Sequence, residues 1–136
     1  MLMLTNTSNC VDAQATKRMT ALVIDDHPAA QAALRDLLAA AFPLWTVLVA
    51  ANASEAIAIN ARSHPALAIV DVNLPDANGI DLAAALKHQR PALVTVMISV
   101  QDGAHYRAQA QATGAAAYLR KDRLGTELEP LLRTLL

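Results

Sequence analysis

The chain has 136 residues, of which 54% are hydrophobic and only 3% aromatic, and its formal net charge at pH 7 is −1. This length suits one domain with a core of alanine and aliphatic side chains. The balanced charge provides no basic face, which argues against direct nucleic-acid binding. The single cysteine, Cys10, excludes a disulfide framework and a cysteine zinc site. No apolar run reaches the roughly 18 residues of a membrane span, so we expect a cytoplasmic protein without membrane association.

The first 18 residues differ from the rest of the chain. Residues 1–18 have no hydrophobic period and are rich in threonine, asparagine and serine, which predicts a disordered leader before a domain over 19–136. Along that domain, short apolar runs alternate with helical patterns. The predicted strands cover residues 20–25, 46–51, 66–70, 93–98 and 116–120. The predicted helices run from Pro28 to just before Pro43, then over 54–64, 80–89, about 103–112 and about 123–136.

Individual residues mark several of these boundaries. Pro28 suits the first position of a helix because its fixed φ is already helical. Ser54 is expected to cap the second helix, which Pro65 ends. Gly114 is a plausible residue for the left-handed conformation that closes a helix.

Five strands alternating with five helices predict a doubly wound α/β fold with right-handed crossovers and a parallel sheet in the order 2-1-3-4-5. In such an open parallel sheet, the ligand site lies beyond the carboxyl ends of the strands, where the direction of winding reverses. The residues that end the apolar runs are therefore the candidates for function.

Five side chains with charged or hydroxyl groups stand where these apolar runs end: Asp25, Asp26, Asp71, Ser99 and Lys121. Three neighbouring carboxylates repel one another unless a cation lies among them, and Mg²⁺ prefers such oxygen ligands. The ammonium and the hydroxyl suit an anion. Together they predict a site for Mg²⁺ and a phosphoryl group, in which an oxygen of Asp71 attacks phosphorus. Lys121, with its head group exposed to the pocket, and Ser99 would stabilise the transferred group.

At these residues the chain resembles the receiver domain of bacterial response regulators, which has a flavodoxin-like fold. The matching pieces are VIDDHP (23–28), IVDVNLPDANGIDL (69–82), VMISV (96–100) and GAAAYLRKD (114–122). The resemblance covers residues 19–136. It implies that Asp26 and Asp71, with the backbone carbonyl of Asn73, bind Mg²⁺ directly, and that Asp25 acts through water.

The resemblance also implies a signalling role. Asp71 would be the phosphoacceptor for a sensor histidine kinase or phosphotransfer protein, Lys121 the phosphoryl partner, and Ser99 with Tyr118 the switch pair. Such a domain phosphorylates and dephosphorylates itself but is not a turnover enzyme. Phosphorylation would change the face made by the last two helices and the last strand, and a partner would recognise that face. We also expect homodimerisation.

The DDHP and YLRKD wording resembles the subgroup whose output is a helix-turn-helix DNA-binding domain, and these 136 residues contain no such domain. A stand-alone receiver or a phosphorelay intermediate is the alternative. The chain also departs from the family in two places. Asp122 stands where many receivers have proline, which puts the family's usual cis peptide in doubt because a non-proline cis bond costs about 3–4 kcal/mol. Val100 is bulkier than the usual alanine and is expected to narrow access to the site.

Two other functions compete with this interpretation. An Asp-nucleophile phosphohydrolase of the haloacid dehalogenase type needs a second aspartate two residues after the nucleophile, but Asn73 stands there and has no proton to shuttle. A nucleotide-binding module needs a glycine-rich first turn, and the sequence there is DDHPAA. His27 is expected to begin the first helix rather than to bind a metal.

Overall fold

A computed structural model describes residues 18–100 and 103–136, so the leader predicted over 1–18 lies outside the described residues except for Arg18. The described chain forms one five-stranded parallel sheet in the order β2-β1-β3-β4-β5. The strands are β1 (Thr20–Ile24), β2 (Thr46–Ala50), β3 (Leu67–Asp71), β4 (Val94–Ser99) and β5 (Ala117–Arg120). The predicted doubly wound topology and strand order are confirmed.

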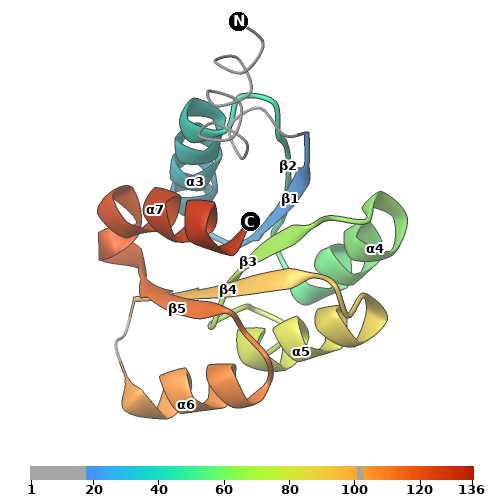
Figure 1. Cartoon of the computed structure of the whole chain (residues 1–136). Helices are drawn as coiled ribbons and strands as arrows, with labels where there is room; N and C mark the ends of the chain where they lie inside the picture. The colour runs from blue at the N-terminus through green and yellow to red at the C-terminus, as the bar shows by residue number, and fades with distance from the viewer. Residues whose placement is uncertain (1–17, 101–102) are drawn as a thin grey trace, which may run out of the picture.

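Five helices cover the two faces of the sheet (Figure 1). They are α3 (Pro28–Ala41), α4 (Ala53–Ser63), α5 (Gly79–Gln89), α6 (Ala104–Ala112) and α7 (Leu124–Leu135), with a 3₁₀ turn, η1 (Lys121–Arg123), before α7. Helices α3 and α7 lie on one face, and α4, α5 and α6 lie on the other. None of the helices in the described part of the chain combines the length and apolarity needed to cross a bilayer.

The alternation of side chains along each strand divides the core into two layers. On β1, Leu22 and Ile24 pack with the apolar residues of α4 and α5, while Ala21 and Val23 pack with those of α3 and α7. Residues on both faces of β1, β3 and β4 are almost completely buried. Burial on both faces explains why the sequences of these strands are continuous apolar runs rather than alternations of apolar and polar residues.

The helix boundaries test the predicted caps. Pro28 occupies the first turn of α3, and Gly114 has φ +90°, both as predicted. The cap predicted at Ser54 is wrong, because α4 begins at Ala53 and its N-cap is Asn52. The Asn52 side chain accepts a hydrogen bond from the backbone N–H of Glu55 at 2.9 Å, which satisfies one of the free donors of the first turn.

Candidate functional site

The polar residues predicted at the strand ends do meet at one edge of the sheet. Ile24 of β1 pairs with Val70 of β3, so that Asp25 and Asp71, the next residue of each chain segment, lie side by side. Asp71 pairs with Ile98 of β4, which places Ser99 beside it at the end of the neighbouring strand. Lys121 follows the last residue of β5. The topology therefore brings together residues that are far apart in the sequence.

Lys121 joins two of the acids. Its Nζ lies 2.7 Å from Asp25 Oδ2 and 3.0 Å from Asp71 Oδ2, and both carboxylates are buried. The Lys121 side chain is only 16% exposed. The expectation of a head group exposed to the pocket is therefore wrong, because the two buried carboxylates draw the ammonium in between them. The bond between Lys121 and Asp122 is trans, since the described residues contain no cis peptide.

Burial and pairing act in opposite directions on these groups. Burial raises the pKa of Asp71 above its ordinary value, and the hydrogen bonds from Lys121 and from the Asn73 backbone lower it without cancelling that effect. For Lys121, burial lowers the pKa, but its hydrogen bonds to Asp25 and Asp71 outweigh burial and hold the pKa above its ordinary value. Lys121 therefore stays charged in the folded protein. The ionised form of Asp71, by contrast, lowers the free energy of unfolding.

This cost predicts a pH-dependent effect of Asp71→Asn on stability. Because the pKa of Asp71 is higher in the folded state, its contribution to stability is full at low pH and is lost as pH rises through the folded pKa. In the absence of divalent ions, the variant should be more stable than the wild type at pH 7, and this difference should shrink as pH falls through the raised folded pKa of Asp71 and be lost by about 3.9, the ordinary pKa of aspartate. Urea unfolding at several pH values measures it. A variant that is less stable at pH 7, or a difference that does not change with pH, would contradict this assignment.

His27 joins three aspartates at the same edge of the sheet. One ligand atom from each of Asp25, Asp26, His27 and Asp71 lies within 4.8 Å of every other, which is close enough to hold one metal ion. His27 is the N-cap of α3, as its predicted place at the start of the helix requires, but its imidazole turns toward the acids. Sequence reasoning missed this contact. The only signal was the position of His27 directly after two strand-end acids.

The loop between β3 and α5 is held by backbone contacts. The Asn73 N–H donates to Asp71 Oδ1 at 3.2 Å, and Asn73 also forms an isolated bridge with Asn78, the N-cap of α5. Asp76 accepts hydrogen bonds from the N–H groups of Ala53 and Ser54 at 2.8 and 3.2 Å, which ties the loop to the start of α4. The hydrogen bond from Ala53 lowers the pKa of Asp76. These contacts fix the backbone at Asn73 next to Asp71.

The predicted switch pair lies on adjacent strands. Ser99 pairs with Arg120, and Met97 pairs with Tyr118, so the Ser99 and Tyr118 side chains project from the same face of the sheet. Ser99 is buried, and Tyr118 is only 7% exposed. The Tyr118 side chain is thus turned inward in this structure.

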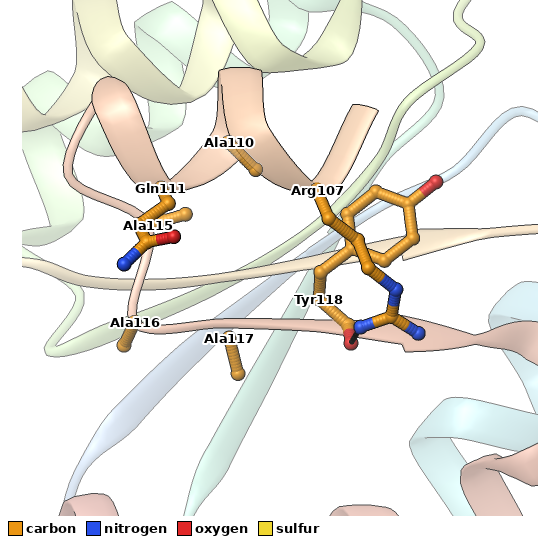
Figure 2. Close-up of a pocket in the computed structure, with 7 residues that line it drawn as sticks. All are labelled: Arg107, Ala110, Gln111, Ala115, Ala116, Ala117 and Tyr118. Atoms are coloured by element: carbon orange, nitrogen blue, oxygen red, sulfur yellow. Dashed lines mark hydrogen bonds between the residues drawn. The ribbon is translucent and has the colours of Figure 1, made fainter. Parts of the chain in front are cut away.

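Tyr118 lies beneath a side chain of α6. The guanidinium carbon of Arg107 is 4.9 Å from the centre of the Tyr118 ring, and Nη1 of Arg107 donates to the Tyr118 carbonyl at 3.2 Å. Figure 2 shows the two side chains side by side at one end of a pocket of about 360 Å³ between α6 and β5. Ala110 is the only residue of α6 that is fully buried, so this helix is held to the sheet by few core contacts.

The doubly wound sheet, with its acids and lysine at the carboxyl edge, is a flavodoxin-like receiver fold. The chain belongs to the response regulator receiver domain family, whose model matches residues 21–133. Receivers of two-component response regulators accept phosphate from histidine kinases, and they are signalling domains rather than turnover enzymes.

Similar curated proteins are transcription regulators. The chain is 35% identical over 106 residues to the DNA-binding transcriptional activator DevR/DosR of Mycobacterium tuberculosis, covering 78% of this chain and 49% of that protein. It is 30% identical over 120 residues to the probable transcriptional regulatory protein TcrX of the same organism, covering 87% of this chain and 50% of that protein. The chain thus spans about half the length of the curated relatives it matches.

Solved structures agree with the fold. The signal receiver domain of an HD domain-containing protein from Pseudomonas fluorescens superposes with a TM-score of 0.79 at 26% identity, covering 87% of this chain and 94% of that one. The fold and the family are therefore established together.

Proposed function

We propose that this receiver domain takes a phosphoryl group onto Asp71 from a sensor histidine kinase or a phosphotransfer protein. The observation that carries the proposal is the position of Lys121, whose ammonium bridges the carboxylates of Asp71 and Asp25 at the sheet edge. The same ammonium can follow negative charge from the carboxylate to a phosphoryl group bound to it. The side chains on either side are anchored to different strands, so they hold their places while Asp71 reacts.

The residues at this edge fit Mg²⁺. Asp26 and Asp71, with the backbone carbonyl of Asn73, would hold the ion directly, and Asp25 would act through water. A carboxylate oxygen of Asp26 is buried and, among the described residues, has only the His27 imidazole beside it, at 3.2 Å, and one ligand atom from each of Asp25, Asp26 and Asp71 lies within 4.8 Å of the others, which fits a single cation. When bound, the ion would offset the negative charge of the phosphoryl group as it is transferred.

The proposed reaction is a simple displacement. An oxygen of Asp71 attacks phosphorus, and the bond from phosphorus to the donor atom breaks with its electron pair leaving on the donor. Lys121 neutralises charge on the transferred group, and the Ser99 hydroxyl donates a hydrogen bond to one of its oxygens. Hydrolysis of the product is slow in this proposal, because Asn73 occupies the place where a hydrolase of this chemistry needs an acid.

Incubation with a small phosphodonor tests the proposal directly. With Mg²⁺ present, intact-mass analysis should show the addition of one phosphoryl group, and chelation of the divalent ion should suppress it. A protein that remains unmodified under conditions that phosphorylate a known receiver would overturn the proposal.

The two neighbouring acids that follow β1 should contribute unequally to Mg²⁺ binding. Asp25 is fully buried and engaged on both oxygens, by the His27 N–H at 2.9 Å and by Lys121 at 2.7 Å, whereas the Asp26 side chain is 34% exposed and its Oδ1 has only the His27 imidazole, at 3.2 Å, in the described part of the chain. Asp26→Asn should weaken Mg²⁺ binding about tenfold or more, and Asp25→Asn by a smaller factor, because only the first removes a direct ligand. Calorimetric titration measures both affinities. An unchanged affinity in Asp26→Asn is the result that would remove this residue from the site.

We also assign the output to the face made by α6, β5 and α7. A phosphoryl group on Asp71 would draw the Ser99 hydroxyl toward it and so hold Tyr118 in its inward position, which α6 with its few core contacts could follow. Coupling of this kind is typically worth 1–3 kcal/mol. NMR shifts with and without beryllium fluoride should therefore extend into residues 103–136, and changes confined to the acid cluster would refute this route.

The partner that reads this face is proposed to be a DNA-binding output domain. The support is the similarity to DevR/DosR, a DNA-binding transcriptional activator of which this chain spans 49%. The proposal places the protein in the cytoplasm, with homodimerisation as one route to activation, and it gives this domain no direct contact with nucleic acid. A stand-alone receiver or phosphorelay intermediate remains the alternative, and the full reading frame decides between them.

A further inference from the structure

A polar pocket lies at the opposite edge of the sheet from the acids. It has a volume of about 350 Å³ and is lined by Asn60, Ala61, His64, Gln89 and Arg90. Helices α4 and α5 both end there, since His64 and Arg90 are their C-cap residues and stand shortly before β3 and β4 begin. The pocket is therefore separate from the carboxyl edge, and no step of the proposed phosphoryl transfer uses it.

The inner wall of this pocket contains an amide with an unpaired oxygen. Asn60 of α4 is fully buried, and its Nδ2 donates to the Leu86 carbonyl at 3.3 Å and to Gln89 Oε1 at 2.8 Å. These acceptors fix the orientation of the amide, because the reverse orientation would place its oxygen against the Leu86 carbonyl. Asn60 Oδ1 has no hydrogen-bond partner among residues 18–100 and 103–136. A buried amide oxygen of this kind favours a ligand that donates a hydrogen bond.

Arg90 provides a complementary donor in the same pocket. Its Nη1 lies 2.6 Å from His64 Nδ1, and its Nε is buried without a hydrogen-bond partner in the described part of the chain. Among the described residues, the arginines paired with carboxylates are Arg120, Arg123 and Arg133, so Arg90 has no acidic partner there. A carboxylate is a stronger acceptor for a guanidinium than an imidazole is, so a bound carboxylate would replace His64 as the partner of Arg90.

The two helix ends determine what else a ligand of this pocket must carry. The last carbonyls of α4 and α5 bear partial negative charge, which disfavours a bare anion and favours a cation at the same end. A ligand held here therefore needs a carboxylate for Arg90 and a positively charged donor for Asn60 Oδ1. One small molecule fits a pocket of about 350 Å³, which is near the lower end of the range for ligand sites.

We propose that this pocket binds a small zwitterion with the carboxylate and ammonium groups of an α-amino acid. The carboxylate accepts hydrogen bonds from the guanidinium of Arg90, and the ammonium donates to Asn60 Oδ1. The site goes beyond the proposed function, because phosphoryl transfer to Asp71 does not require this ligand. It gives the domain a second, non-covalent input at the edge away from Asp71.

NMR titration of the isotope-labelled full chain with L-alanine tests this assignment. Two matched probes lack one charged group each: propionate has no ammonium, and ethylammonium has no carboxylate. Each is added at constant ionic strength, and the side-chain N–H signals of Asn60 and Arg90 are followed. Arg90→Gln keeps the backbone N–H that donates to the Leu86 carbonyl at 3.0 Å, so it should fold. Arg62→Gln is the matched control, because Arg62 is an exposed arginine on α4.

L-alanine should shift both side-chain signals of the wild type until they saturate. It should bind at least about tenfold more tightly than propionate or ethylammonium, because each of these loses one charge-assisted hydrogen bond. Arg90→Gln, followed at the Asn60 amide, should lose about tenfold or more of the affinity for L-alanine, and Arg62→Gln should keep it within about twofold.

Three results would overturn the inference. The first is the absence of a saturable shift at Asn60 and Arg90. The second is binding of propionate as tight as that of L-alanine, which would make the pocket a plain anion site. The third is an equal loss of affinity in Arg62→Gln, which would show that net charge controls binding. Phosphorylation of Asp71 is measured in a separate assay, so a failure of the proposed function leaves this test unaffected.

Discussion

Asp71→Asn should reduce phosphorylation by a small phosphodonor to the background of the assay, while Asp36→Asn leaves it unchanged. Asparagine keeps the size of the side chain and its acceptor oxygen, but it lacks the anionic oxygen that attacks phosphorus. Asp36 is exposed on α3 and serves as the matched control for the loss of one negative charge. Intact-mass analysis after incubation with Mg²⁺ and the donor measures the modified fraction.

Two outcomes would count against Asp71 as the acceptor. The first is phosphorylation of Asp71→Asn at the rate of the wild type, which would place the acceptor at another residue. The second is equal loss in Asp36→Asn, which would show that net charge rather than a nucleophile controls the reaction. Because the Asp71→Asn variant is expected to fold with higher stability at pH 7, loss of phosphorylation cannot be ascribed to unfolding.

Gly79→Ala should be strongly destabilising, although it changes a single hydrogen into a methyl group. A Cβ at Gly79 would lie 1.8 Å from the carbonyl oxygen of Asp71 and 2.8 Å from the Cα of Val72. Both are backbone atoms, and the Gly79 N–H donates to the Val72 carbonyl at 2.7 Å, so neither side can yield without loss of that contact. We expect a loss of about 3 kcal/mol or more in the free energy of unfolding, at the upper end of the range for overpacked sites.

The matched control for this variant is Gly125→Ala. Gly125 lies in the first turn of α7, and a Cβ there would meet nothing within 4 Å. Alanine should be neutral or should stabilise by up to about 1 kcal/mol, because it favours helix more than glycine does. Urea unfolding of both variants measures the contrast. Equal stability of the two would mean that the start of α5 can move away from β3 without cost.

Strand-end residues were the most predictable part of this protein. Buried parallel strands have an unmistakable apolar pattern, and the topology then requires Asp25, Asp71 and Lys121 to meet. The positions of the side chains beyond the strands were less predictable. The pattern placed Lys121 at the edge but not between two carboxylates, because a long flexible side chain follows local charge that no periodicity records.

The features that were not predicted share one cause, which is that no local sequence pattern encodes them. Asn52 and Ser54 are both good caps two residues apart, and only the path of the chain after β2 decides which one begins α4. The tie from Asp76 to the start of α4 joins residues 23 positions apart, so no local motif reveals it. His27 contacts Asp25 and Asp26 through its imidazole, and the sequence records this only as a histidine between two acids and a proline.

The pairing of Lys121 with Asp25 also joins the two ends of the described fold. One partner directly follows the first strand and the other lies in the turn after the last strand, so the ion pair closes a loop that contains most of the domain. A chain whose fifth strand has not docked lacks the Lys121 ammonium at Asp71, however complete the other four strands are. During synthesis, the acids emerge long before the lysine that balances them. In the proposed function, the chain would therefore complete its phosphoryl site only once β5 has docked against β4.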